Sequence, residues 1–181
     1  NSKANNIQLL DIPGGLSQQI IKAEFWRLDF CQNYVCIDSD SYFIRNFYKK
    51  DFISDEGSLY SVLHQNKEFF QIAANRNRSK VITEQSAEAK RVQEIFGRKG
   101  PLFFSAPSPF LWSKKVWESL DREYLIPNGI TIWDFINPKR PESLIYCETL
   151  LKYKAIPIIA IEPLFRTYHY DWYKSEEHTS E

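Results

Sequence analysis

The chain has 181 residues, of which 43% are hydrophobic, 15% aromatic and 25% charged. This composition predicts one folded domain, because disordered chains lack the apolar surface that offsets the entropy cost of ordering. Lys plus Arg equals Asp plus Glu at 23 each, so no overall field attracts a polyanion, and no nucleic acid partner is indicated. The longest apolar stretch, 155–165, contains two prolines and a glutamate, and a membrane span needs about 20 apolar residues, so no span is predicted.

The first half of the chain predicts a helix, a buried strand and a hairpin. Residues 18–30 place apolar side chains at near-helical spacing after Ser17, which can cap a helix. Residues 34–37 form an apolar run without alternation, as expected for a strand that is buried on both faces. Two strand-like runs within 52–63 flank a polar turn, which predicts an antiparallel hairpin.

The second half of the chain alternates helices with a final strand. Helical patterns with inward apolar residues cover 83–96, 113–120 and 142–153. Residues 155–161 predict the last strand, whereas 103–110 is Pro-rich and irregular. The alternation predicts an α/β sandwich around a mostly parallel sheet, formed by residues 1–170 and followed by a polar tail.

Three cysteines, Cys31, Cys36 and Cys147, are odd in number and contain no C-x-x-C pair. This pattern favours a reducing compartment, the cytoplasm, over a disulfide scaffold. We expect all three to be small buried side chains.

The acidic pair Asp38 and Asp40 directly follows the predicted strand 34–37. In an open α/β sheet, ligands bind beyond the carboxyl ends of the strands. Strand alternation would put both carboxylates on one side and Ser39 on the other. Two carboxylates form half of a site for Mg²⁺ or Mn²⁺, which complete their coordination with phosphate oxygens and water. Because chance often produces D-x-D, solvated turn carboxylates are the alternative.

Three further segments accompany the acidic pair in a fixed order. They are Q-Q-I-I-K at 18–22, P-F-L-W-S at 109–113 and E-S-L-I-Y-C at 142–147. This order resembles a bacterial glycosyltransferase family of the GT-A type, with the pattern Q-Q-x-x-K, D-x-D, P-x-x-W and S-E-x-x-x-Y-G. The resemblance covers about residues 14 to 170 and departs at Pro141 and Cys147, where the family has Ser and Gly.

The resemblance implies a GT-A-like sandwich that moves a sugar from a nucleotide-sugar donor to a saccharide or lipid-linked acceptor, as in polysaccharide biosynthesis. A bound Mn²⁺ or Mg²⁺ would neutralise charge that develops on the leaving nucleoside diphosphate. GT-A proteins place their first nucleotide-binding strands before the D-x-D, and only 37 residues precede it here. We therefore expect the chain to be N-terminally incomplete, with those strands missing.

The resemblance also implies roles for single residues. Lys22, Gln18, Gln19, Asp38 and Ser39 would bind the donor, and Asp38, Asp40 and His169 would bind the metal. Asp40 would thereby also be catalytic. In an inverting enzyme, Glu142 is the candidate general base, because a carboxylate must remove the proton of the acceptor hydroxyl. Trp112 is a candidate for stacking on a sugar.

Each of these assignments has a plainer alternative. Lys22 can be a solvated helix residue, Glu142 a first-turn carboxylate favoured by the helix dipole, and His169 a surface histidine. For the whole chain, a haloacid-dehalogenase-type phosphohydrolase with Asp38 as nucleophile and a non-catalytic carbohydrate-binding domain are the alternatives. Tyr42 stands where the phosphohydrolases have Thr or Val, so the transferase is favoured.

Overall fold

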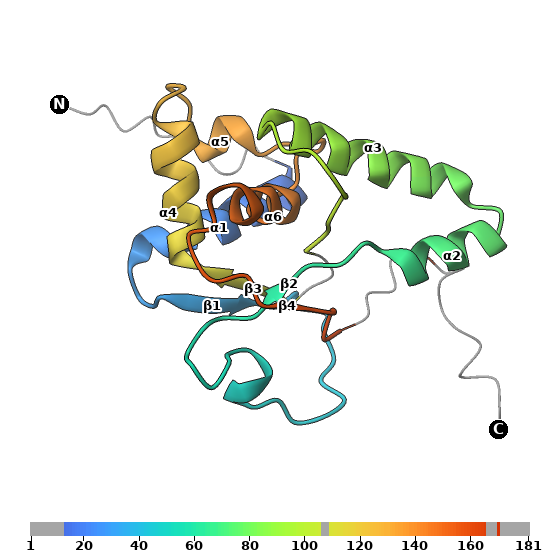
Figure 1. The fold of residues 1–181 in the computed structure, drawn as a ribbon, viewed down its shortest axis with the longest axis horizontal. Coiled ribbons are helices and arrows are strands. Elements are labelled where there is room, and N and C mark those ends of the chain that lie inside the picture. The colour runs from blue at the N-terminus through green and yellow to red at the C-terminus, as the bar shows by residue number, and fades with distance from the viewer. Residues whose placement is uncertain (1–12, 106–108, 166–169, 171–181) are drawn as a thin grey trace.

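The computed structural model describes residues 13–105, 109–165 and 170, and every structural statement below concerns these residues. The elements follow in the order α1 (Gly14–Glu24), η2 (Phe25–Leu28), β1 (Asn33–Cys36), η3 (Lys49–Asp51), β2 (Ser61–Val62), α2 (Lys67–Asn75), α3 (Ser79–Ile95), β3 (Phe110–Ser113), α4 (Lys114–Leu120), η4 (Asp121–Leu125), α5 (Ile132–Phe135), α6 (Glu142–Tyr153) and β4 (Ala160–Ile161). In Figure 1, α1, α4 and α6 lie on one side of the strands and segment 37–60 lies on the other. No helix within the described ranges is long and apolar enough to cross a membrane.

Two short strand pairs lie at the centre of the fold. β1 pairs antiparallel with β3, so that Tyr34 lies opposite Trp112 and Cys36 opposite Phe110. β2 and β4 pair in parallel over two residues. The fold is therefore mixed α/β, as predicted, but parallel pairing does not predominate in the described part of the chain.

The core is built on the aromatic side chains that β3, α4 and α6 bring together. Trp112, Trp117 and Tyr146 are each at most 3% exposed. The Trp112 and Tyr146 rings stack with centroids 5.5 Å apart, and the Trp117 ring lies 5.3 Å from that of Tyr146. The Ser113 amide donates a 2.8 Å hydrogen bond to the Tyr146 hydroxyl. Because aromatic pairs add about 0.5–1.5 kcal/mol each beyond area burial, this cluster holds α6 against β3.

Most helices occur where the sequence predicts them. α6 matches the predicted range 142–153, and α3 ends before Gly97, whose φ of +62° is the left-handed conformation that glycine adopts at helix ends. The predicted hairpin forms through a bridge between Ile53 and Leu59. The three cysteines are free thiols, and Cys147 is buried as predicted, whereas Cys31 and Cys36 are only partly buried.

Three local predictions are wrong for identifiable reasons. α1 begins at Gly14, and the Ser17 hydroxyl donates to the Pro13 carbonyl instead of capping the helix. β3 occupies residues 110–113, where a short apolar run after Pro109 carries no alternation signal. β1 is buried on one face only, since Tyr34 faces the core and Val35 is 38% exposed.

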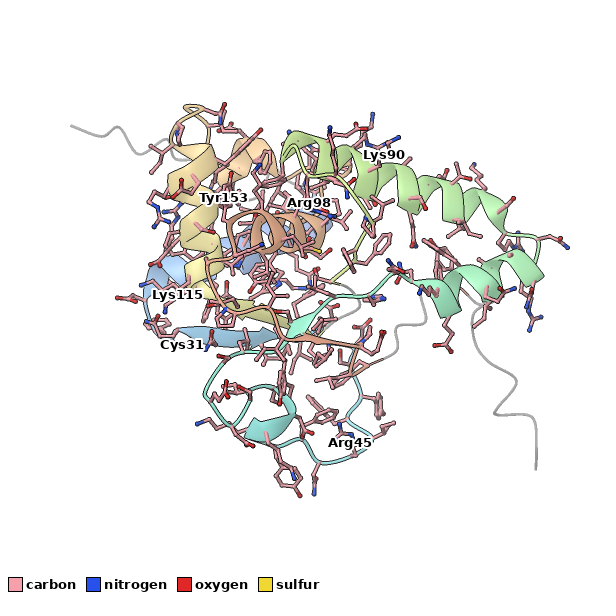
Figure 2. All side chains as sticks on the ribbon, viewed as in Figure 1. Cys31, Arg45, Lys90, Arg98, Lys115 and Tyr153 are labelled. Carbon is pink, nitrogen blue, oxygen red and sulfur yellow. The ribbon has the colours of Figure 1, made fainter. Side chains whose placement is uncertain are left out.

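A buried ion pair joins the loop after α3 to the middle of α6. Arg98, which lies beside α6 in Figure 2, donates from Nε and Nη2 to the two carboxylate oxygens of Glu148, at 2.6 and 2.8 Å. The Glu148 side chain is only 2% exposed. The guanidinium therefore neutralises a carboxylate that water cannot reach.

Removing this guanidinium should destabilise the fold strongly. Arg98→Ala leaves Glu148 buried without its partner, and we expect a loss of about 3–5 kcal/mol in the free energy of unfolding. Urea denaturation followed by tryptophan fluorescence measures this loss. Lys80→Ala, which breaks the exposed 3.8 Å pair with Glu84 on α3, is the control and should cost less than about 0.5 kcal/mol. Equal losses in the two variants would contradict the prediction.

Candidate functional site

Two of the sequence motifs meet where α1 passes the end of β1. Gln18 and Lys22 are four residues apart, so they share one face of α1. The Lys22 Nζ lies 2.5 Å from the Asp38 Oδ1, and the Gln18 Nε2 lies 3.4 Å from the same oxygen. The Q-Q-x-x-K and D-x-D segments therefore form one polar cluster.

The backbone turns immediately after Asp38. The Ser41 amide donates to the Asp38 carbonyl at 3.0 Å, which closes a turn over 38–41. Asp38 is half-buried beside α1, whereas Ser39 and Asp40 are exposed. Because the strand ends at Cys36, alternation does not relate Asp40 to Asp38, and the predicted common side for the two carboxylates has no basis in strand geometry.

Glu142, the first residue of α6, brings a third motif to this cluster. Its side chain is buried, and burial raises the pKa of the carboxyl above its ordinary value. The backbone amides of Glu142 and Ser143 and the charge of Lys22 oppose this rise in pKa, while Asp38 adds to it. Glu142 therefore lies at the start of α6, within electrostatic reach of Lys22 and Asp38.

Cys36 and Phe110 form an apolar border to the cluster. Burial is the main cause that raises the pKa of the Cys36 thiol to about 12, with Lys22 opposing the rise and Glu142 and Asp38 adding to it. A thiol with that pKa stays protonated near neutral pH and is a poor nucleophile. The Lys22 Nζ lies 5.1 Å from the centroid of the Phe110 ring, so the ammonium also makes a cation–π contact.

Several predicted site residues do not join the cluster. Gln19 Oε1 is buried without a hydrogen-bond partner among the described residues. Trp112 is 1% exposed, so the prediction that it stacks on a sugar is wrong: its ring packs inside the core. His169 lies outside the described residues. Within the described ranges, no three His, Cys, Asp or Glu side chains are grouped so as to hold a metal.

No local sequence pattern predicts Cys36 and Phe110 as neighbours of the polar cluster. Phe110 lies in a Pro-rich stretch without periodicity, and Cys36 looked like an ordinary buried residue. The β1–β3 register places them opposite each other, next to Lys22. Predicting their proximity requires the strand at 110–113 and its pairing with β1.

Comparison of the chain with protein-family models, with curated proteins and with solved structures finds no match. The likeness to GT-A glycosyltransferases therefore depends on the motifs themselves. The positions of the motif residues in space are a separate observation from the order of the motifs in the chain, because Lys22, Asp38 and Glu142 come from segments up to 120 residues apart. The three segments are close enough for their charges to influence one another.

The buried carboxyl of Glu142 should make stability depend on pH. Since its pKa is raised in the folded state, the protonated form stabilises the fold below the ordinary pKa of 4.5, and this contribution is lost as pH rises through the folded-state pKa. The stability of the wild type relative to Glu142→Gln should therefore fall over that range, by about 1.4 kcal/mol for each pH unit between the two pKa values.

Urea denaturation of both proteins between pH 4 and pH 8, at steps of roughly half a unit, measures this difference. Glu84→Gln, an exposed position on α3, controls for the loss of one negative charge. A difference between wild type and Glu142→Gln that stays constant across the range would contradict the raised pKa.

Proposed function

We propose that this chain is a divalent-metal-dependent glycosyltransferase of the GT-A type that moves a sugar from a nucleotide-sugar donor to a saccharide or lipid-linked acceptor. One observation carries the proposal: Lys22, Asp38 and Glu142, each from a different motif, converge on one cluster. The D-x-D segment pairs with the lysine of one further motif and lies within electrostatic reach of the glutamate of the other, which a D-x-D produced by chance does not require.

Asp38 and Asp40 suit a metal that the donor helps to coordinate. Their carboxylates offer hard oxygen ligands, and Mg²⁺ and Mn²⁺ commonly complete their shells with phosphate oxygens and water. Lys22 contacts Asp38 through Oδ1, so the candidate metal ligand and the lysine lie side by side. When bound, the metal would neutralise charge on the leaving diphosphate.

Lys22 and Gln18 are the proposed donor contacts. The Lys22 side chain is 14% exposed and holds a positive charge beside the candidate metal ligands. An ammonium there attracts phosphate oxygens. If Lys22 leaves Asp38 to bind a phosphate of the donor, the ammonium still has an anionic partner. The amide of Gln18 can donate to a phosphate or a sugar hydroxyl.

Glu142 is the proposed general base. Proton abstraction is most effective when the pKa of the base lies near the working pH, and burial moves the pKa of Glu142 upward in that direction. The first amides of α6 and the charge of Lys22 oppose this rise in pKa. A buried carboxyl with a raised pKa fits the removal of a proton from an acceptor hydroxyl.

Binding of a nucleoside diphosphate should require both a metal and the acidic pair. Titration calorimetry with UDP and GDP should detect binding in the presence of Mn²⁺ and none after chelation, because the metal links the carboxylates to the diphosphate. Asp40→Ala should abolish this binding, and Asp55→Ala, in an exposed turn, should leave it unchanged. Metal-independent binding, or no binding, would contradict the proposal.

Turnover should depend on the ionisation of Glu142. In an assay that screens nucleotide sugars for Mn²⁺-dependent hydrolysis, Glu142→Gln should lower kcat by about 10²–10⁴-fold. The kcat/KM of the wild type should rise with pH through the raised pKa of Glu142, because only the carboxylate accepts a proton, and the variant should lack this rise. Hydrolysis of a generic phosphate ester in place of a nucleotide sugar would instead indicate a phosphohydrolase.

A further inference from the structure

Residues 42–48, named loop 42–48 below, present large apolar side chains to solvent. Tyr42 is 88% exposed, Ile44 93% and Tyr48 58%. They lie within one short segment that begins two residues after Asp40. Clustered exposed apolar side chains of this size mark an interaction surface more often than single ones do.

Ring contacts attach loop 42–48 to the rest of the protein. Phe47 stacks on Phe165 and Phe52, with ring centroids 5.0 and 5.9 Å apart, and Phe43 contacts Phe165 edge to face at 5.6 Å. Phe43 is itself 54% exposed, so Phe47 makes the main attachment of the loop, and Tyr42 and Ile44 face solvent.

Basic residues gather within the loop itself. Residues 41–50 contain Arg45, Lys49 and Lys50, and the adjacent acidic residues, Asp40 and Asp51, lie just outside that range. Arg45, in the segment below the strands in Figure 2, stacks on the Phe47 ring at 3.9 Å and lies 3.6 Å from the Asp51 carboxylate. Lys49 and Lys50 begin η3 and are both exposed. Two exposed lysines therefore directly follow Tyr48.

We propose that loop 42–48 is a membrane-interface anchor that inserts Tyr42, Ile44 and Tyr48 into the headgroup region of a bilayer containing anionic phospholipid. Tyrosine favours this region because its ring is apolar and its hydroxyl is polar. Lysines next to the surface gain attraction to anionic headgroups while their stems lie along the apolar boundary. Three side chains and two charges give weak, reversible binding.

The shape of the surface favours a bilayer over a protein partner. Two tyrosines and an isoleucine expose less than the roughly 800 Å² per partner that a standard protein–protein interface buries. The segment also projects from the side of the strands opposite α1, α4 and α6 (Figure 1). A projecting tip can enter a soft interface without a complementary groove.

The anchor would also select the acceptor, and this consequence depends on the proposed function. Tyr42 follows Asp40 by two residues, so a bilayer bound at Tyr42 would lie near the candidate metal ligands. A transferase held in this way would act on a lipid-linked acceptor in preference to a free saccharide. Membrane binding itself does not require any catalytic activity.

Cosedimentation of the full 181-residue chain with vesicles tests the anchor. The wild type should bind vesicles of phosphatidylglycerol and phosphatidylcholine more tightly than vesicles of phosphatidylcholine alone, and added salt should weaken the binding. Tyr42→Ser/Ile44→Ser should weaken it by about tenfold or more, because apolar surface leaves the interface. Lys49→Ser/Lys50→Ser should weaken it by about fivefold per lysine. Ile44→Trp should tighten it, since tryptophan prefers the interface.

Matched controls lie elsewhere on the surface. Ile126, 67% exposed after η4, gives Ile126→Ser as the apolar control. Lys90 on α3 and Lys115 on α4, both labelled in Figure 2, give Lys90→Ser/Lys115→Ser as the charge control. Both controls should bind vesicles as the wild type does.

Two outcomes would overturn the anchor. One is a wild type that binds neither vesicle, or a Tyr42→Ser/Ile44→Ser variant that binds as well as the wild type. The other is concentration-dependent dimerisation in sedimentation velocity, abolished by that variant and unaccompanied by vesicle binding, which would assign the surface to a second copy. Neither assay contains nucleotide or metal, so failure of the anchor and failure of the transferase proposal are separate results.

Discussion

The contact between β3 and α6 holds the candidate site together. Trp112 stacks on Tyr146, and the amide of the next residue, Ser113, donates to the Tyr146 hydroxyl. Glu142 lies four residues before Tyr146 and hence on the same face of α6. Fixing the tyrosine therefore fixes the carboxylate. Through the pairing of β3 with β1, the same contact fixes Asp38 relative to Glu142.

The electrostatics of the cluster depend on one lysine. The charge of Asp38 raises the pKa of Glu142, and the charge of Lys22, which pairs directly with Asp38, lowers it. Burial is the stronger influence on Glu142, which leaves its pKa raised. A ligand that draws Lys22 away from Asp38 would change the charge balance around Glu142. In the proposed transferase, donor binding would therefore influence the proposed base, Glu142, through Lys22.

The main core lies on one side of the strands, and the exposed loop 42–48 lies on the other. The helices cover the side that holds Tyr34, Trp112 and most of the core. On the other side, a smaller cluster around Leu59, Val62 and Leu111 supports segment 37–60, and rings from Phe43 and Phe47 hold loop 42–48 in place. The turn at 38–41 connects the two sides. The acidic pair thus lies where the chain passes from the packed core to the exposed loop.

The sequence by itself determined the strongly periodic elements and the motif residues. The helix at 142–153, the end of α3 at Gly97 and the hairpin at 52–63 follow from local patterns, because helix periodicity, left-handed glycine and turn chemistry act over a few residues. Lys22, Asp38 and Glu142 could be selected as candidates through the motifs. Cys36 and Phe110 could not, since their place beside Lys22 comes from a strand pairing between residues 74 apart in the chain.

Only the tertiary structure decided how the motif residues are used. Trp112 and Tyr146 became core side chains because β3 and α6 meet there, although the sequence allowed Trp112 to be a sugar contact. Asp38 turned toward Lys22 because the strand ends at Cys36 and α1 passes beside it. The pKa of Glu142 rose because packing excluded water from the first turn of α6. These positions and this pKa depend on burial and on contacts between residues far apart in the chain. A pattern of a few neighbouring residues contains neither kind of information.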